Sequence, residues 1–150
     1  MEINVKKFDE KAIIPTKAHR TDAGYDLYAC LDENEYFPSG STSMIPTGIA
    51  FEIPEGYFGA IYPRSGLATK QGLRLANCVG VIDCGYINQV YVPLINDSNG
   101  IRVVKNGDRI AQIIFQPYPP LFTIFFRRDF KNCPLNLPPI LTLFYYFELF

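Results

Sequence analysis

The sequence predicts an all-β domain, and three observations lead to this prediction. Short runs of β-branched and aromatic residues, several of them alternating apolar with polar, recur along most of the chain. Turn signals rich in Gly, Asn and Pro separate these runs. Only one stretch, Ser65–Gln71, is typical of a helix, and Gly72 follows it as a C-terminal cap. Regularly spaced short strands of this kind favour a jelly roll or a distorted β-barrel.

Turn chemistry places the individual strands. Residues 38–41 (PSGS), 54–56 (PEG), 96–100 (NDSNG) and 106–108 (NGD) offer Gly, Asn or Pro where a turn requires unusual backbone angles. The strands predicted between such signals are, in chain order, Ile3–Phe8, Tyr25–Cys30, Ser43–Pro46, Ile49–Ile53, Tyr57–Tyr62, Leu73–Ala76, Val90–Asn96, Ile101–Val104 and Arg109–Gln116.

The charge balance narrows the possible partners. With 14 basic and 15 acidic residues the formal charge is −1, which argues against direct nucleic-acid binding because that needs a basic surface. A local cationic pocket for one small anion is compatible with this balance. The longest apolar run, residues 140–147, is much shorter than the ~20 residues that span a bilayer. No membrane association is expected.

The cysteines and the N-terminus favour a cytoplasmic protein. Cys30, Cys78, Cys84 and Cys133 form no C-x-x-C pair and His19 is the only histidine, so no zinc site is expected. The N-terminal sequence MEINVKKF is polar and charged rather than a secretory leader. Free thiols in the cytoplasm are the expectation.

Composition divides the chain in two. All eleven glycines occur by Gly107, whereas six of the twelve prolines occur from Pro117 onward. The expected organisation is therefore a β-barrel domain over residues 1–120 and a Phe-, Leu- and Pro-rich tail over residues 121–150. A shifted reading frame would also produce a tail of this composition.

Four segments carry the chemistry: AGYDLYA (Ala23–Ala29), PRSGLA (Pro63–Ala68), NCVGVIDCGY (Asn77–Tyr86) and RIAQIIF (Arg109–Phe115). In order and spacing they resemble the first four motifs of the trimeric dUTPase family, over roughly residues 1–118. The resemblance implies a homotrimer with sites at subunit interfaces. It also implies Mg²⁺-assisted hydrolysis of dUTP to dUMP and pyrophosphate, which limits uracil in DNA and supplies dUMP for thymidylate synthesis.

The third segment is expected to bind uracil. A β-hairpin arm over residues 73–82 would present backbone groups, including those of Val81 and Ile82, together with the Asn77 amide. Uracil offers acceptor, donor, acceptor along its edge, whereas cytosine reverses part of this pattern and leaves buried polar groups unpaired. In the family, the residue matching Asn77 contacts uracil and the one matching Tyr86 packs under the deoxyribose. Tyr91 is a further candidate to flank this slot; its alternative is an ordinary exposed strand tyrosine.

Asp83, at the end of this arm, is the candidate catalytic residue. Hydrolysis of a nucleoside triphosphate needs an oriented water with a base within hydrogen-bond reach. The resemblance assigns this role to Asp83, with attack at the α-phosphorus. For an isolated aspartate, the alternative would be a residue that starts an Asx-type turn before Gly85.

The second and fourth segments are expected to bind phosphate. Helix N-termini favour anions, and Arg64 adds a forked cation beside Ser65 and Gly66. The alternative is a capped helix with a surface arginine. Gln112 resembles the family's phosphate-contacting glutamine; its alternative is a polar residue on an outward strand face.

Asp26 and Arg109 belong to the first and fourth segments. Asp is depleted in strands, and the resemblance assigns Asp26 a water of the Mg²⁺ that bridges the triphosphate. We expect Arg109 to form a structural ion pair.

One expected motif is missing. The family's fifth motif is a glycine-rich arm that closes over the nucleotide, and no glycine follows Gly107. A dUTP-binding regulatory trimer with little turnover is therefore an alternative function. A dCTP deaminase of the same superfamily is disfavoured, because INQVYVPLIN after Tyr86 lacks the glutamate that such enzymes carry there.

Overall fold

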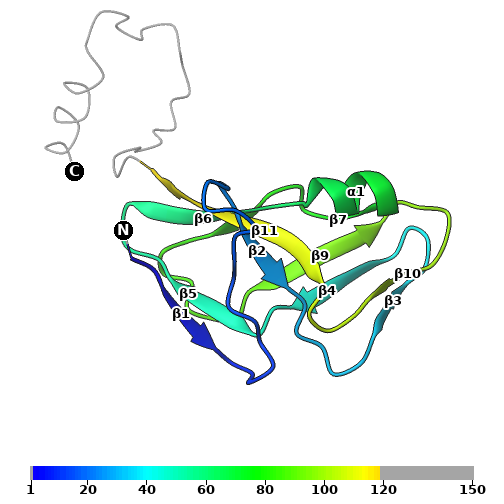
Figure 1. Cartoon of the computed structure of the whole chain (residues 1–150), viewed down its shortest axis with the longest axis horizontal. Coiled ribbons are helices and arrows are strands. Elements are labelled where there is room, and N and C mark those ends of the chain that lie inside the picture. The colour runs from blue at the N-terminus through cyan, green and yellow to red at the C-terminus, as the bar shows by residue number, and fades with distance from the viewer. Residues whose placement is uncertain (1, 119–150) are drawn as a thin grey trace, which may run out of the picture. The chain divides into compact units, whose positions relative to one another are not determined.

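The computed structural model describes residues 2–118. The predicted tail, residues 121–150, lies outside the described residues. The strands are β1 (Asn4–Lys7), β2 (Tyr25–Tyr28), β3 (Glu35–Phe37), β4 (Thr42–Pro46), β5 (Ile49–Glu52), β6 (Tyr57–Tyr62), β7 (Leu73–Leu75), β8 (Gly80–Ile82), β9 (Tyr91–Asn96), β10 (Arg102–Val104) and β11 (Arg109–Pro117), and the helix is α1 (Ser65–Gln71). The predicted all-β fold with one short helix is confirmed (Figure 1).

Two main sheets and two ribbons organise these strands. One sheet has the order β2-β11-β6-β8 and the other β4-β9-β7, while β1 pairs with β5 and β10 with β3. All of these pairings are antiparallel. The core draws inward-facing residues from both main sheets, such as Leu27 and Ile113 from the first and Val92 and Leu94 from the second. Alternation along each strand explains this, because every second side chain points to the same face.

The predicted hairpin arm over residues 73–82 is wrong. β7 pairs with β9 in the three-stranded sheet, whereas β8 pairs with β6 in the four-stranded sheet. The turn between them therefore connects two sheets instead of closing a hairpin. In its pairing with β9, β7 places Leu73 opposite Asn96 and Leu75 opposite Leu94, and both leucines are buried.

Asn96 is a buried polar residue that organises the loop after β9. Its side-chain Nδ2 donates to the carbonyl oxygens of Phe37 at 2.8 Å and of Gly100 at 2.7 Å. Its Oδ1 accepts from the backbone N–H of Ser98 at 2.9 Å and from the Ser98 hydroxyl at 2.7 Å. The side chain is fully buried, so these bonds replace all of its hydration. Asn96 thereby links β9, β3 and the loop over residues 97–100.

Helix α1 is held mainly at its C-terminal end. It contains no fully buried residue, although Leu67 packs against the core. Gly72 ends it with a left-handed φ of 69°, as predicted, and a Cβ there would lie 2.9 Å from the backbone nitrogen of Ser98. The Gly72 carbonyl accepts from the N–H of Asp97 at 2.8 Å, and Arg102 Nε donates to the carbonyl of Gln71 at 2.6 Å.

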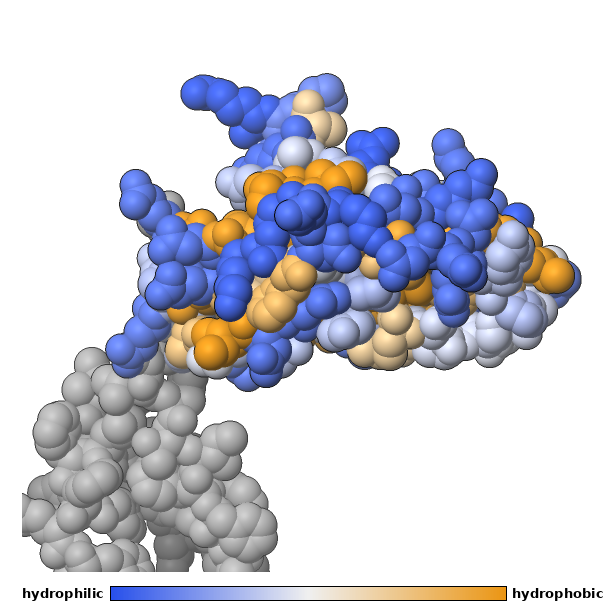
Figure 2. Space-filling model, turned by 90° about the horizontal axis from the view of Figure 1, so that it is seen from below, coloured by the Kyte–Doolittle hydropathy of each residue, from blue (hydrophilic) through white to orange (hydrophobic). Residues whose placement is uncertain are grey.

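Within the described residues, the structure contains no helix with the length and hydrophobicity needed to cross a membrane. Figure 2 shows one face of the molecule, where hydrophilic side chains predominate and hydrophobic groups are exposed between them.

Candidate active site

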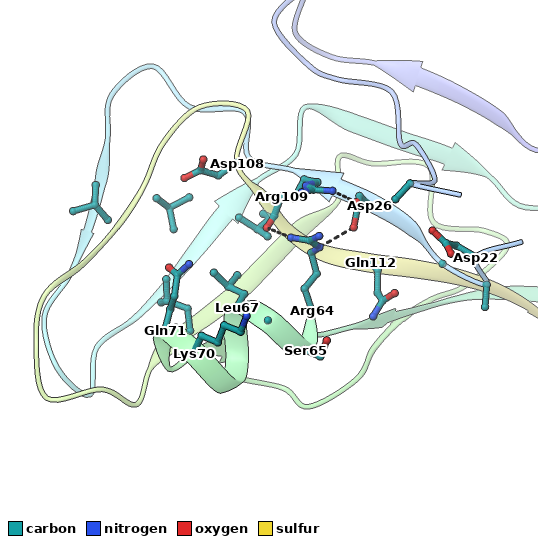
Figure 3. Close-up of a pocket in the computed structure, with 18 residues that line it drawn as sticks. Asp22, Asp26, Arg64, Ser65, Leu67, Lys70, Gln71, Asp108, Arg109 and Gln112 are labelled. Atoms are coloured by element: carbon teal, nitrogen blue, oxygen red, sulfur yellow. Dashed lines mark hydrogen bonds and ion pairs between the residues drawn. The ribbon is translucent and has the colours of Figure 1, made fainter. Parts of the chain in front are cut away.

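A cavity of about 720 Å³ lies along α1, from Ser65 at the N-terminal end of the helix to Gln71 at its C-terminal end (Figure 3). β2, α1 and β11 contribute most of the polar side chains that line it. Five residues from the sequence prediction are among the lining residues: Asp26, Arg64, Ser65, Gly66 and Gln112. Segments far apart in the sequence thus contribute to one hollow.

Asp26 is the centre of a charged cluster in this cavity. Its Oδ1 accepts from Arg64 Nε at 2.8 Å and its Oδ2 from Arg109 Nη1 at 3.2 Å. The Asp26 side chain is only 13% exposed, whereas that of Arg109 is 47% exposed. The structural ion pair predicted for Arg109 is therefore present, and the cluster carries one net positive charge toward the cavity.

Gln112 lies opposite Asp26 in the pairing of β11 with β2. Its Nε2 donates to the carbonyl of Pro63 at 3.1 Å, which ties β11 to the residue before Arg64. A Cβ on Gly24 would lie 2.7 Å from Gln112 Oε1, a distance that real Cβ atoms do not reach. Gly24 therefore leaves the space that the Gln112 side chain occupies. Gly24 was not among the predicted site residues, although it stands two residues before Asp26 in the first motif.

The residues predicted to bind uracil lie elsewhere on the chain. Asn77, Val81, Ile82, Asp83, Tyr86 and Tyr91 are all absent from the lining of this cavity. Val81 is 59% exposed, and Asp83 and Tyr86 are exposed as well. One protomer therefore carries two separate groups of predicted site residues.

A tight turn follows Asn77. The N–H of Val79 donates to the carbonyl of Asn77 at 2.7 Å, and Cys78 between them has a left-handed φ of 63°. This is a three-residue γ-type turn, which is rare and strained. It brings the Asn77 amide against Gly80, where an added Cβ would lie 3.4 Å from Asn77 Nδ2.

Asp83 begins a second turn. The N–H of Tyr86 donates to the backbone carbonyl of Asp83 at 3.0 Å, and the Tyr86 hydroxyl donates to the carbonyl of Gln89 at 3.0 Å. The bond that closes this turn uses the Asp83 backbone and not its carboxylate. The carboxylate, on an exposed residue, is accessible to a ligand.

The described residues contain no group of three or more His, Cys, Asp or Glu side chains arranged to hold a metal ion. Asp22, Asp26 and Asp108 line the cavity singly, and both oxygens of Asp26 already face arginines. Single carboxylates of this kind fit Mg²⁺, which keeps several waters and takes substrate phosphates as ligands. They do not fit a metal ion that is held entirely by protein side chains. Asp26 would hold Mg²⁺ through water.

The family model described as dUTPase matches residues 10–132. The chain belongs to the dUTPase family. It is 42% identical over 123 residues to the deoxyuridine 5'-triphosphate nucleotidohydrolase of Wolbachia pipientis, covering 81% of this chain and 80% of the relative.

Solved dUTPase structures share the fold. A variant dUTPase from phage phi11 of S. aureus, which reveals the coordination of a structural Mg(II) ion, superposes with a TM-score of 0.74 at 26% identity, covering 87% of this chain and 99% of that one. A variant of the Staphylococcus bacteriophage 80alpha dUTPase with dUpNHpp superposes with a TM-score of 0.72 at 26% identity, covering 85% and 99%. The latter structure is described in terms of phage dUTPases that control the transfer of virulence genes.

Proposed function

We propose that this dUTPase family member hydrolyses dUTP to dUMP and pyrophosphate with the aid of Mg²⁺. By this reaction it would limit uracil in DNA and supply dUMP for thymidylate synthesis. The observation that carries the proposal is the assembly of Asp26, Arg64, Ser65, Gly66 and Gln112 around one cavity. Each comes from one of the motifs that resemble the family.

The cavity would bind the triphosphate. Arg64 stands directly before α1, and the first-turn residues Ser65 and Gly66 are exposed, so their unpaired N–H groups can reach an anion. The Arg64 guanidinium presents a planar fork that matches phosphate oxygens. Gln112 adds an amide from the neighbouring strand. Bound Mg²⁺ would neutralise phosphate charge, with Asp26 holding it through water.

The segment from Asn77 to Tyr91 would bind the nucleoside. The Asn77 amide and the backbone of Val81 and Ile82 would read the uracil edge, and Tyr86 would pack against the deoxyribose. Tyr91 would flank the base. Asp83, at the end of this segment, would orient the attacking water and accept its proton.

A homotrimer would bring the two groups together, one from each of two protomers. The separation of the two groups on one chain supports this, because neither group contains both the residues predicted to bind uracil and those predicted to bind the triphosphate. Exposed apolar side chains on β4 and β9, where Met44 lies diagonally across from Tyr91, offer a surface for subunit contact. Closed threefold symmetry would then give three equivalent sites.

Assembly is directly measurable. Light scattering on the full chain at micromolar concentration should give a particle three times the 17.0 kDa chain mass. A stable particle of single-chain mass would contradict the shared site.

Steady-state release of pyrophosphate tests the reaction and its selectivity together. With Mg²⁺, dUTP should be hydrolysed, and kcat/KM for dCTP, dTTP and UTP should be at least about tenfold lower. The reason is that each wrong nucleotide leaves a buried polar group unpaired or clashes, at about 1–3 kcal/mol. Equal rates for uridine and cytidine nucleotides would refute the uracil slot.

A dUTP-binding regulatory trimer with little turnover is the second candidate. The absence of glycine from residues 108–150 favours it, as does the fold shared with phage dUTPases that control the transfer of virulence genes. Tight binding of a dUTP analogue without pyrophosphate release would identify this function. For either candidate we propose a cytoplasmic location, in keeping with the free thiols of Cys30, Cys78 and Cys84.

A further inference from the structure

We propose that Arg109 is a positioning residue that frees Arg64 to bind substrate phosphate, by keeping Asp26 neutralised when Arg64 leaves it. This inference rests on the proposed function, because it concerns the phosphate end of the same site. It assigns Arg109 a role beyond a structural ion pair.

The direction of the Arg109 side chain depends on a β-bulge. Arg109 and Gln112 are three residues apart, so on a regular strand they would point to opposite faces. The pairing of β11 with β2 shifts between Arg109, opposite Tyr28, and Ala111, opposite Leu27. Ile110 is the extra residue, and it and Ala111 are consecutive and both buried, at 1% and 0% exposure. The bulge thus restores Arg109 to the face on which Asp26 and Gln112 line the cavity.

Arg64 is held in the same charged cluster around Asp26. Its Nε bonds Asp26 Oδ1 at 2.8 Å, and its Nη1 approaches the carbonyl of Arg109 at 3.5 Å, a weak contact. To bind a phosphate with its guanidinium group, Arg64 has to break at least one of these two contacts. Its departure leaves the largely buried Asp26 carboxylate with one partner fewer.

Arg109 makes that exchange possible. It bonds the other oxygen of Asp26 from a side chain that is half exposed, and it does not need to move when Arg64 does. Without Arg109, the release of Arg64 would leave the partly buried Asp26 carboxylate without a cationic partner, which is unfavourable in free energy. Arg64 would then stay on Asp26, and phosphate would compete for it less well.

Binding calorimetry on the assembled full chain tests this proposal. The ligands are dUMP and a non-hydrolysable dUTP analogue, in EDTA so that no metal contributes. Arg109→Gln should lower the ratio of analogue affinity to dUMP affinity by about tenfold, the size of one charged hydrogen bond. Arg109→Lys, which keeps the charge, should recover most of this loss. Lys11→Gln removes the cation of an ion pair with Asp32 away from the cavity and should leave the ratio unchanged.

A double-mutant cycle separates positioning from simple attraction. If Arg109 acts through Asp26, then in an Asp26→Asn background Arg109→Gln should change the ratio by less than about twofold. An unchanged ratio in Arg109→Gln alone would overturn the inference. So would a parallel loss of both affinities with a lowered melting temperature, which a purely structural role predicts. A wild type that binds neither ligand would instead refute the proposed function, and the inference with it.

Discussion

Replacing Asp83 by Asn is expected to lower dUTP turnover by about 10²–10⁴-fold, the usual contribution of a positioned base. The substitution keeps the size of the side chain but removes the proton acceptor. It also leaves the turn intact, because the bond that closes the turn uses the backbone carbonyl of Asp83. Pyrophosphate release at saturating dUTP measures the effect.

Affinity for a non-hydrolysable dUTP analogue separates chemistry from binding. It should change little in Asp83→Asn, since Arg64 and Asn77 are untouched. Because residues 108–150 contain no glycine, a chimera carrying a family-type glycine-rich tail after Pro120 provides the second background. The chimera should be faster than the wild type, and Asp83→Asn should abolish the gain. Unchanged turnover of the Asp83→Asn chimera would remove Asp83 from the reaction.

Replacing Asn96 by Ala is expected to lower the free energy of unfolding by about 3 kcal/mol. The substitution leaves the carbonyl of Phe37 without its partner in a buried setting, and the carbonyl of Gly100 and the N–H of Ser98 lose theirs in a partly buried one. Urea unfolding followed by fluorescence or circular dichroism measures the change.

Asn4→Ala is the matched control for this prediction. Asn4 makes one exposed hydrogen bond, to Glu52, at 2.8 Å. Its loss should therefore cost less than about 1 kcal/mol, since water replaces the partner. Equal effects of the two substitutions would show that the Asn96 network does not stabilise the fold.

Local sequence patterns predicted most of the fold. Each of the nine predicted strands has a counterpart within one or two residues of its expected ends, and the helix and its Gly72 cap are confirmed. β8 (Gly80–Ile82) was expected only as part of the hairpin arm over residues 73–82, and β3 (Glu35–Phe37) was missed because it is too short for an alternating pattern to be recognised. The stability of β3 comes from pairing with β10, which is a tertiary effect.

Pairing partners were harder to predict than strands. The segments around Leu73 and Ile82 are close in sequence and separated by a turn, which favours a hairpin. In the structure each joins a different sheet, because β9 and β6 bury their apolar faces. Nothing in the local sequence distinguishes these outcomes.

The candidate site was predicted as a list of residues but not as an arrangement. The motifs named Asp26, Arg64 and Gln112, and the cavity brings them together. The bulge at Ile110 and the contact of Gly24 with Gln112 depend on strand register, which residue spacing alone does not specify. The two separate groups of site residues likewise follow from the topology.

The attachment of α1 has a consequence for its motion. The helix is seven residues long, too short to be stable alone, and its C-terminal end is bonded to Asp97 and packed on Ser98. Asn96 holds that same loop. The helix and the loop should therefore open together as one cooperative unit, with a shared free energy of local unfolding. Asn96, at the far end of the helix, therefore affects how rigidly the N-terminal end of α1 is held. That end carries Arg64, Ser65 and Gly66, the residues proposed to bind an anion, although Asn96 itself is not among the predicted ligand-binding residues.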